Sequence, residues 1–184
     1  MKWMIASDIH GSAPNCAAML ERFRVEGAER LILLGDLLYH GPRNDLPEGY
    51  DPKAVIALLS EARDRLLCVR GNCDAEVDQM VLPFPILSDT LLLCEDGLTV
   101  LATHGHLFNE EQLPPLQKGD VLLHGHTHIP VLENRGDYWL LNPGSVSIPK
   151  EGSARGYLTL ENGCFTHKSL TGRELARLSI ESRI

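Results

Sequence analysis

The sequence predicts an α+β sandwich, in which helices cover two packed β-sheets. Residues 2–72 alternate short apolar runs with amphipathic helical segments. The rest of the chain is rich in short strand patterns and poor in helical ones. With 184 residues, 43% of them hydrophobic, the chain is long enough to bury one good core. We therefore expect one domain over residues 1–184.

The first part of the chain is predicted as β-α-β-α-β. The first helix is expected to begin after Ser12, a common N-cap residue, and to end at Gly27. The second is expected over residues 52–62, capped by Asp51. The three strands are short apolar runs bounded by turn residues, at residues 2–6, 31–34 and 66–69.

The second part of the chain is predicted as a series of antiparallel or mixed strands. A hairpin is indicated where two apolar runs flank Glu95-Asp96-Gly97. The expected strands are residues 91–94, 98–102, 121–123, 131–133, 138–141, 157–160 and 165–169. Residues 172–184 are ambiguous between a short helix, an edge strand and a loose tail.

Charge and composition exclude several function classes. The net charge is −8, from 17 Lys and Arg against 25 Asp and Glu, which argues against general nucleic-acid binding. Apolar stretches are too short for a membrane span, and the N-terminal run is too short for a signal peptide. The five cysteines are widely spaced and odd in number, which is typical of a reduced, cytoplasmic protein.

Five short polar segments follow apolar runs and carry metal-ligand side chains. In an open α/β sheet the carboxyl ends of the strands share one edge, where ligands bind. Imidazole, carboxylate and amide groups are ligands of divalent metals. We therefore expect one metal-binding cleft built from Asp8-x-His10, Gly35-Asp36, Gly71-Asn72-Cys73-Asp74, Thr103-His104-Gly105-His106 and Gly125-His126-Thr127-His128.

This order of motifs resembles the calcineurin-like metallophosphoesterase superfamily. The short chain, and Gly-Asn-Cys-Asp at residues 71–74 where larger members have Gly-Asn-His, is similar to its small bacterial YfcE-type phosphodiesterase branch. The resemblance covers Asp8 to about Ser145. It implies a four-layer α/β/β/α sandwich with two mixed β-sheets flanked by helices.

The resemblance also implies a ligand set for two divalent ions. One ion is expected on Asp8, His10, Asp36 and His128. The other is expected on Asp36, Asn72, His104 and His126, so that Asp36 bridges the two. Oxygen and imidazole ligands suit Mn²⁺, the first choice, and also Zn²⁺, Fe²⁺, Co²⁺ or Mg²⁺.

The chemistry of such a site predicts metal-dependent phosphodiester hydrolysis. Two carboxylates against two divalent ions leave an excess of about two positive charges, which a bimetal-bridged hydroxide and a phosphodiester monoanion match. The expected partner is therefore a small phosphodiester, with nucleotide-derived compounds among the candidates. A homo-oligomer is left open.

Cys73 and His106 are the candidate catalytic residues beside the metals. Many superfamily members carry a His at the position of Cys73, which assists the leaving group. A thiol is a poorer proton donor, so good leaving groups should be preferred unless His106 or His40 donates the proton. A small residue filling space is the alternative interpretation of Cys73. Arg43 is a candidate to grip phosphate.

The sequence is also compatible with two alternative functions. A phosphomonoesterase would need more cationic or donor groups for a dianionic substrate. A non-catalytic scaffold of the same fold is the second alternative, and such a protein should have lost metal ligands, whereas all seven are present here.

Overall fold

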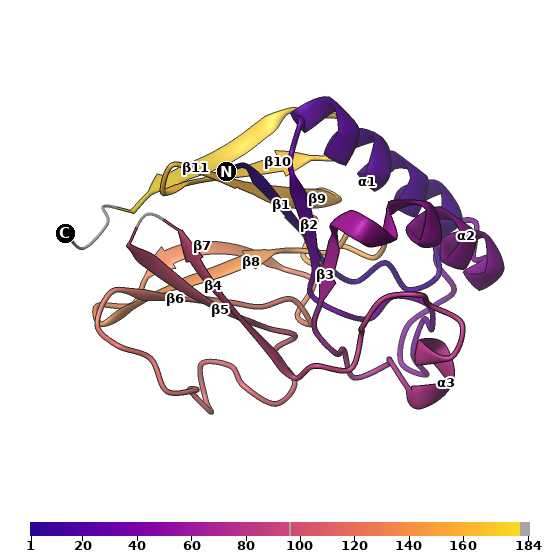
Figure 1. Ribbon diagram of the computed structural model, residues 1–184, viewed down its shortest axis with the longest axis horizontal. Helices are drawn as coiled ribbons and strands as arrows, with labels where there is room; N and C mark the ends of the chain where they lie inside the picture. The colour runs from indigo at the N-terminus through magenta and orange to yellow at the C-terminus, as the bar shows by residue number, and fades with distance from the viewer. Residues whose placement is uncertain (96, 181–184) are drawn as a thin grey trace.

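Two mixed β-sheets pack face to face in the computed structural model, which describes residues 1–95 and 97–180 (Figure 1). The six-stranded sheet has the order β11-β10-β9-β1-β2-β3, and the five-stranded sheet has the order β4-β5-β6-β8-β7. Helices lie against the outside of the first sheet. The predicted α+β class with two mixed sheets is confirmed.

The first part of the chain forms the parallel half of the six-stranded sheet and its helices. Strand β1 pairs in parallel with β2, and β2 with β3. Helix α1 ends at Gly27, which has the left-handed φ of 64° that glycine tolerates. The elements are β1 (Trp3–Ala6), α1 (Ala13–Glu26), β2 (Arg30–Leu33), α2 (Pro52–Ala62), η1 (Arg63–Arg65), β3 (Leu66–Cys68) and α3 (Glu76–Gln79).

The two predicted helix caps have different outcomes. Asp51 accepts a hydrogen bond from the Ala54 amide and caps α2 as expected. Ser12 stands at the N-cap of α1, but its hydroxyl donates to the Glu48 carbonyl and makes no capping bond.

The second part of the chain forms the whole of the five-stranded sheet and then returns to the first. Its strands are β4 (Thr90–Glu95), β5 (Leu98–Thr103), β6 (Asp120–Leu123), β7 (Pro130–Asn134), β8 (Tyr138–Pro143), β9 (Gly156–Glu161), β10 (Cys164–Ser169) and β11 (Glu174–Ser179). The ambiguous segment after residue 172 thus supplies an edge strand, β11, up to Ser179. Residues 181–184 of that segment lie outside the described residues.

Alternating side chains of β1 and β2 divide the apolar interior into two layers. Met4 and Leu31 face α1 and α2, where they pack with helix residues such as Phe23. Ile5 and Ile32 point the other way, into the space between the two sheets. The central strands β1 and β2 are therefore buried on both faces of the sheet, which explains why they are apolar.

The outer layers of the two sheets differ in kind. Helices α1 and α2 cover the six-stranded sheet. Over the five-stranded sheet the expected fourth layer is irregular: residues 104–119 pass there, and the described residues place no helix on that face. Pro115 and Leu116 line a hollow with Leu92 and Leu101 of that sheet. A prolyl segment cannot supply the backbone donors of a helix interior.

Within the described residues, no helix has the length and apolar character needed to cross a membrane.

Glu26, at the end of α1, joins this helix to strands β9 and β10 and to Lys2, the residue before β1. Its carboxylate accepts hydrogen bonds from Lys2 (2.9 Å), Lys168 (2.8 Å) and the Tyr157 hydroxyl (2.8 Å). Burial would raise the pKa of Glu26, but the bonds from Lys168, Lys2 and Tyr157 outweigh it and lower the pKa to about 2.

We expect Glu26→Gln to lower the free energy of unfolding at pH 7 by about 1–2 kcal/mol, since solvent partly screens the cluster. A carboxylate with a depressed pKa stabilises the fold above its unfolded pKa of about 4.5, and this contribution is lost as the pH falls towards about 2. The difference between the two proteins should therefore shrink between those values. Urea unfolding at pH 7, 4 and 2.5 measures it. Glu61→Gln, an exposed change in α2, is the control; a difference that did not vary with pH would contradict the assignment.

Candidate metal centre

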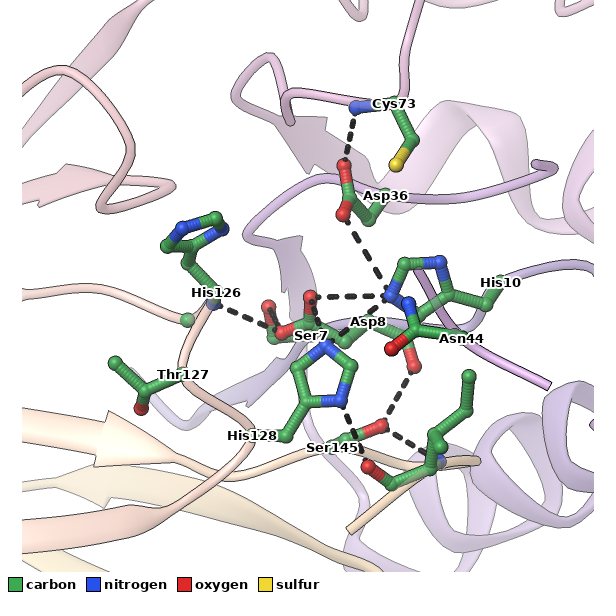
Figure 2. Close-up of polar contacts among 12 residues, drawn as sticks. Ser7, Asp8, His10, Asp36, Asn44, Cys73, His126, Thr127, His128 and Ser145 are labelled. Carbon is green, nitrogen blue, oxygen red and sulfur yellow. Dashed lines mark hydrogen bonds and ion pairs between the residues drawn. The ribbon is translucent and has the colours of Figure 1, made fainter. Parts of the chain in front are cut away.

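The polar segments predicted to share a cleft do lie together, at the carboxyl ends of strands from both sheets. Figure 2 shows Asp8, Asp36, Cys73, His126 and His128 of these segments. The segments after β1, β2 and β3 approach from the six-stranded sheet. Those after β5 and β6 approach from the five-stranded sheet. The seven predicted ligand residues are Asp8, His10, Asp36, Asn72, His104, His126 and His128.

One group of candidate ligand atoms gathers around Asp8. Its Oδ1 lies 3.2 Å from His128 Nε2 and 3.5 Å from His10 Nε2. The two Nε2 atoms are 3.2 Å apart. Asp36 Oδ2 lies 3.5 Å from His10 Nε2. Figure 2 shows these four side chains pointing toward one point.

A second group gathers around His104. Its Nε2 lies 3.0 Å from Asn72 Oδ1, 3.2 Å from His126 Nδ1 and 3.5 Å from Asp36 Oδ2. Asp36 Oδ2 therefore stands at the same distance from His10 and from His104. This oxygen is placed to serve both groups.

The donor set of these groups fits divalent cations. The Nδ1–H groups of His10, His104 and His128 donate to the carbonyls of Tyr39, Leu34 and Ile148 at 2.6–2.8 Å. In the neutral rings Nε2 then carries only a lone pair. Ligand atoms at roughly 2.0–2.2 Å from a shared ion stand about 2.8–3.6 Å apart in octahedral or tetrahedral geometry. The separations here, 3.0–3.5 Å, fall in that range. Among the described residues, the buried Asp8 Oδ1 accepts no hydrogen bond, which fits a cation ligand.

The backbone of the cleft is strained in the way a functional site often is. Asp8, His10, Asp36, His126 and His128 have left-handed φ angles between 48° and 64°. Such angles cost a residue with a Cβ roughly 1 kcal/mol or more and persist where the surroundings enforce them. The sequence contains no pattern that predicts a left-handed backbone at these five residues.

Hydrogen bonds from neighbouring segments hold two of these strained residues. The hydroxyls of Ser145 and Ser147 donate to the Asp8 carbonyl at 2.8 and 2.9 Å. Asp74 accepts from the amides of Asp36, Leu37 and Gly71, at 2.7–2.9 Å. Asp74 thus supports the loop that carries Asp36 and is a structural acceptor.

The charges of the cleft are tightly linked. Burial would lower the pKa of His104, but its bond to Asp36 and the charges of Asp8 and Asp36 raise that pKa to about 9. Burial and then the charge of His104 lower the pKa of His126 to about 4. The carboxylates of Asp8 and Asp36 thus stabilise a positive charge on His104 but not a second one on His126. The same carboxylates would stabilise a metal cation bound between these side chains.

The open part of the cleft has a volume of about 350 Å³ and includes residues that sequence reasoning missed. Asn44 and Lys150, which were not predicted, line it together with Thr127 of a predicted segment and the predicted Arg43. Ser7 precedes the predicted Asp8, and its hydroxyl donates to Asp8 Oδ2 at 2.6 Å, a role that was not predicted. Lys150 lies in a loop without a motif, so only the fold brings it to the site.

The proton-donor candidates lie at different depths. Cys73 lines the cleft, and its Sγ lies near the ligand atoms of His10 and Asp36. Burial and the charge of Asp36 raise the pKa of Cys73 to about 12. His106 stacks edge-on at 5.3 Å from the predicted ligand His104 but does not line the open cleft. His40 packs between Tyr39 and Tyr50 and does not reach the site.

Comparison with known proteins adds independent evidence. A family model described as the calcineurin-like phosphoesterase superfamily domain matches residues 1–163. Phosphodiesterase YfcE of Escherichia coli strain K12 is 52% identical over 162 residues, 88% of each chain.

Solved structures agree with this. The structure of E. coli Yfce, described as a phosphoesterase, has a TM-score of 0.95 at 48% identity and covers 98% of this chain and 100% of its own. Vps29 of Entamoeba histolytica, solved with Zn²⁺, has a TM-score of 0.61 at 17% identity over 98% of this chain and 100% of its own. This second likeness shows the fold alone.

We expect Gly125→Ala to lower the affinity for Mn²⁺ by about 10- to 100-fold, as changes around a ligand shell do. A Cβ at residue 125 would collide with the Ser7 hydroxyl and with Asp8 Oδ2. Isothermal titration with Mn²⁺ measures the effect. Gly136→Ala is the control: it places a Cβ at a φ of 87°, which strains the fold, but in open space away from the cleft. Equal losses of affinity in both variants would contradict the prediction.

Proposed function

The chain belongs to the calcineurin-like phosphoesterase superfamily and is a phosphodiesterase, and we propose that it hydrolyses small phosphodiesters with two divalent metal ions held in the cleft. The family implies divalent metals, and the clustered ligand side chains support them. We further propose a cytoplasmic location, which the five free thiols support.

The observation that carries the two-ion proposal is the position of Asp36. Its Oδ2 lies 3.5 Å from His10 Nε2 and 3.5 Å from His104 Nε2. One carboxylate oxygen is therefore placed to bridge two ions. We assign Asp8, His10, Asp36 and His128 to the first ion, and Asp36, Asn72, His104 and His126 to the second. We favour Mn²⁺, because oxygen and imidazole ligands without thiolate suit it.

When bound, the ions would supply an activated water near neutral pH and positive charge for the phosphoryl oxygens. The chain's own side chains complete the site. Arg43 and Lys150 line the open cleft, where their charges would attract and orient an anionic substrate. Asn44 and Thr127 line the same space and offer hydrogen bonds.

The cleft offers only poor proton donors for the leaving oxygen of the ester. We propose that Cys73 contacts the substrate as a neutral thiol, because a pKa of about 12 makes it a poor acid. Burial and then the charge of His104 lower the pKa of His106, which favours its neutral form. Both candidates thus give little proton donation, so esters with good leaving groups should react best.

We expect Asp36→Asn to reduce metal-dependent hydrolysis of bis(4-nitrophenyl) phosphate by at least about a hundredfold, because the amide cannot bridge two cations as a carboxylate does. Protein stripped by a chelator is assayed with Mn²⁺, Mg²⁺ or Zn²⁺ added back. Asp64→Asn is the matched control, since the Asp64 side chain is 90% exposed. Full activity in the Asp36 variant, with an unchanged fold, would refute the bridging role.

We expect Cys73→His to raise kcat/KM for a diester with a poor leaving group by about tenfold, and much less for a 4-nitrophenyl ester, because imidazolium donates a proton better than a thiol does. Paired assays on an alkyl and a nitrophenyl diester measure this contrast. Cys73→Ser controls for loss of the thiol. An equal change with both substrates would count against a role in proton donation.

A further inference from the structure

A second cavity, of about 430 Å³, adjoins the metal cleft at Cys73, which lines both. It lies among the loop after β2, the start of α2 and the segment around α3. Its walls are mainly apolar and aromatic, and include Leu38, Tyr39, Tyr50, Ile56, Val77 and Val81. None of these side chains is among the proposed metal ligands.

The aromatic wall of this cavity is tied to the metal centre. The Tyr39 carbonyl accepts the Nδ1–H bond that orients the proposed ligand His10. The His40 ring packs between the two tyrosine rings, and its centroid lies 4.8 Å from that of Tyr39 and 5.3 Å from that of Tyr50. Tyr39 therefore both orients His10 in the cleft and lines the adjoining cavity.

The chemistry of the lining selects an uncharged group. No Lys or Arg is among the residues that line the cavity. Its one acid, Asp78, is engaged as acceptor of the Ala75 amide bond at 2.8 Å. Three apolar or aromatic lining residues remain accessible to solvent: Tyr39 is 43% exposed, Val77 64% and Val81 48%. Covering such surface with an apolar group is favourable.

We propose that this cavity binds an uncharged aromatic or apolar ester group of the substrate while the phosphoryl group occupies the metal cleft. The shared wall at Cys73 favours this occupant over a second copy of the chain, because a group attached to a phosphoryl centre in the cleft lies beside it. The proposal rests on the proposed phosphodiesterase function and specifies the class of its substrates.

Three phosphonates test the proposal without requiring turnover. Methylphosphonate, benzylphosphonate and 2-naphthylmethylphosphonate share one anionic group and differ in the apolar group attached to it. Titration calorimetry on the Mn²⁺-loaded protein gives their Kd values. We expect the naphthylmethyl compound to bind about tenfold more tightly than the methyl compound.

A double variant, Val77→Gln with Val81→Gln, should remove most of this preference and leave the Kd of methylphosphonate unchanged. The matched control is Val25→Gln with Met80→Gln. Val25 and Met80 are 52% and 84% exposed, and neither lines the cavity. The control should keep the tenfold preference.

Equal Kd values for the three phosphonates in the wild type would overturn the proposal, as would an unchanged preference in the first double variant. A shift of that variant's sedimentation to a smaller species with the preference intact would assign the surface to contact between copies, and would also overturn it. Bis(4-nitrophenyl) phosphate hydrolysis in the same samples separates the two claims. Turnover without a phosphonate preference refutes the cavity alone, and a preference without turnover supports the cavity while refuting the proposed function.

Discussion

The crowding of lone pairs in the cleft is the constraint on which the rest of the structure depends. The Nε2 atoms of His10 and His128 face each other at 3.2 Å. They lie beside the buried Asp8 Oδ1, which accepts no hydrogen bond from the part of the chain that the structure describes. Such an arrangement is unfavourable unless positive charge lies within it. The carbonyls that orient the rings and the strained ligand backbone both serve this arrangement. The stability of the two-sheet core offsets the cost.

Much of this arrangement was predictable from the sequence. Apolar runs bounded by turn residues located the strands, and the polar residues after five of them located the cleft, because carboxyl ends of neighbouring strands converge. The caps show the limit: Asp51 binds the helix amide as expected, whereas Ser12 is drawn to the Glu48 carbonyl by a loop that packs there. Local propensity yields where tertiary contacts offer a better partner.

Other parts of the site were beyond sequence reasoning. Lys150 and Asn44 reach the cleft only through the paths of their loops, which no periodic pattern encodes. The left-handed angles of the proposed ligands result from tertiary contacts rather than from local preference. The irregular layer over the five-stranded sheet, and the strand formed by Glu174–Ser179, also depend on long-range packing. His40 illustrates the converse: a histidine near the motifs in sequence serves the adjoining aromatic wall instead.

The distribution of the ligands along the chain has a consequence for biosynthesis. Asp8 and His10 are made early, but their partner His128 is oriented by the carbonyl of Ile148, and the Asp8 carbonyl is held by Ser145 and Ser147. A chain emerging from the ribosome therefore lacks a complete site until most of it has been synthesised and both sheets have docked. With the proposed ligand set, metal binding would therefore require a chain whose folding is finished, and an unfinished chain would hold the ions more weakly.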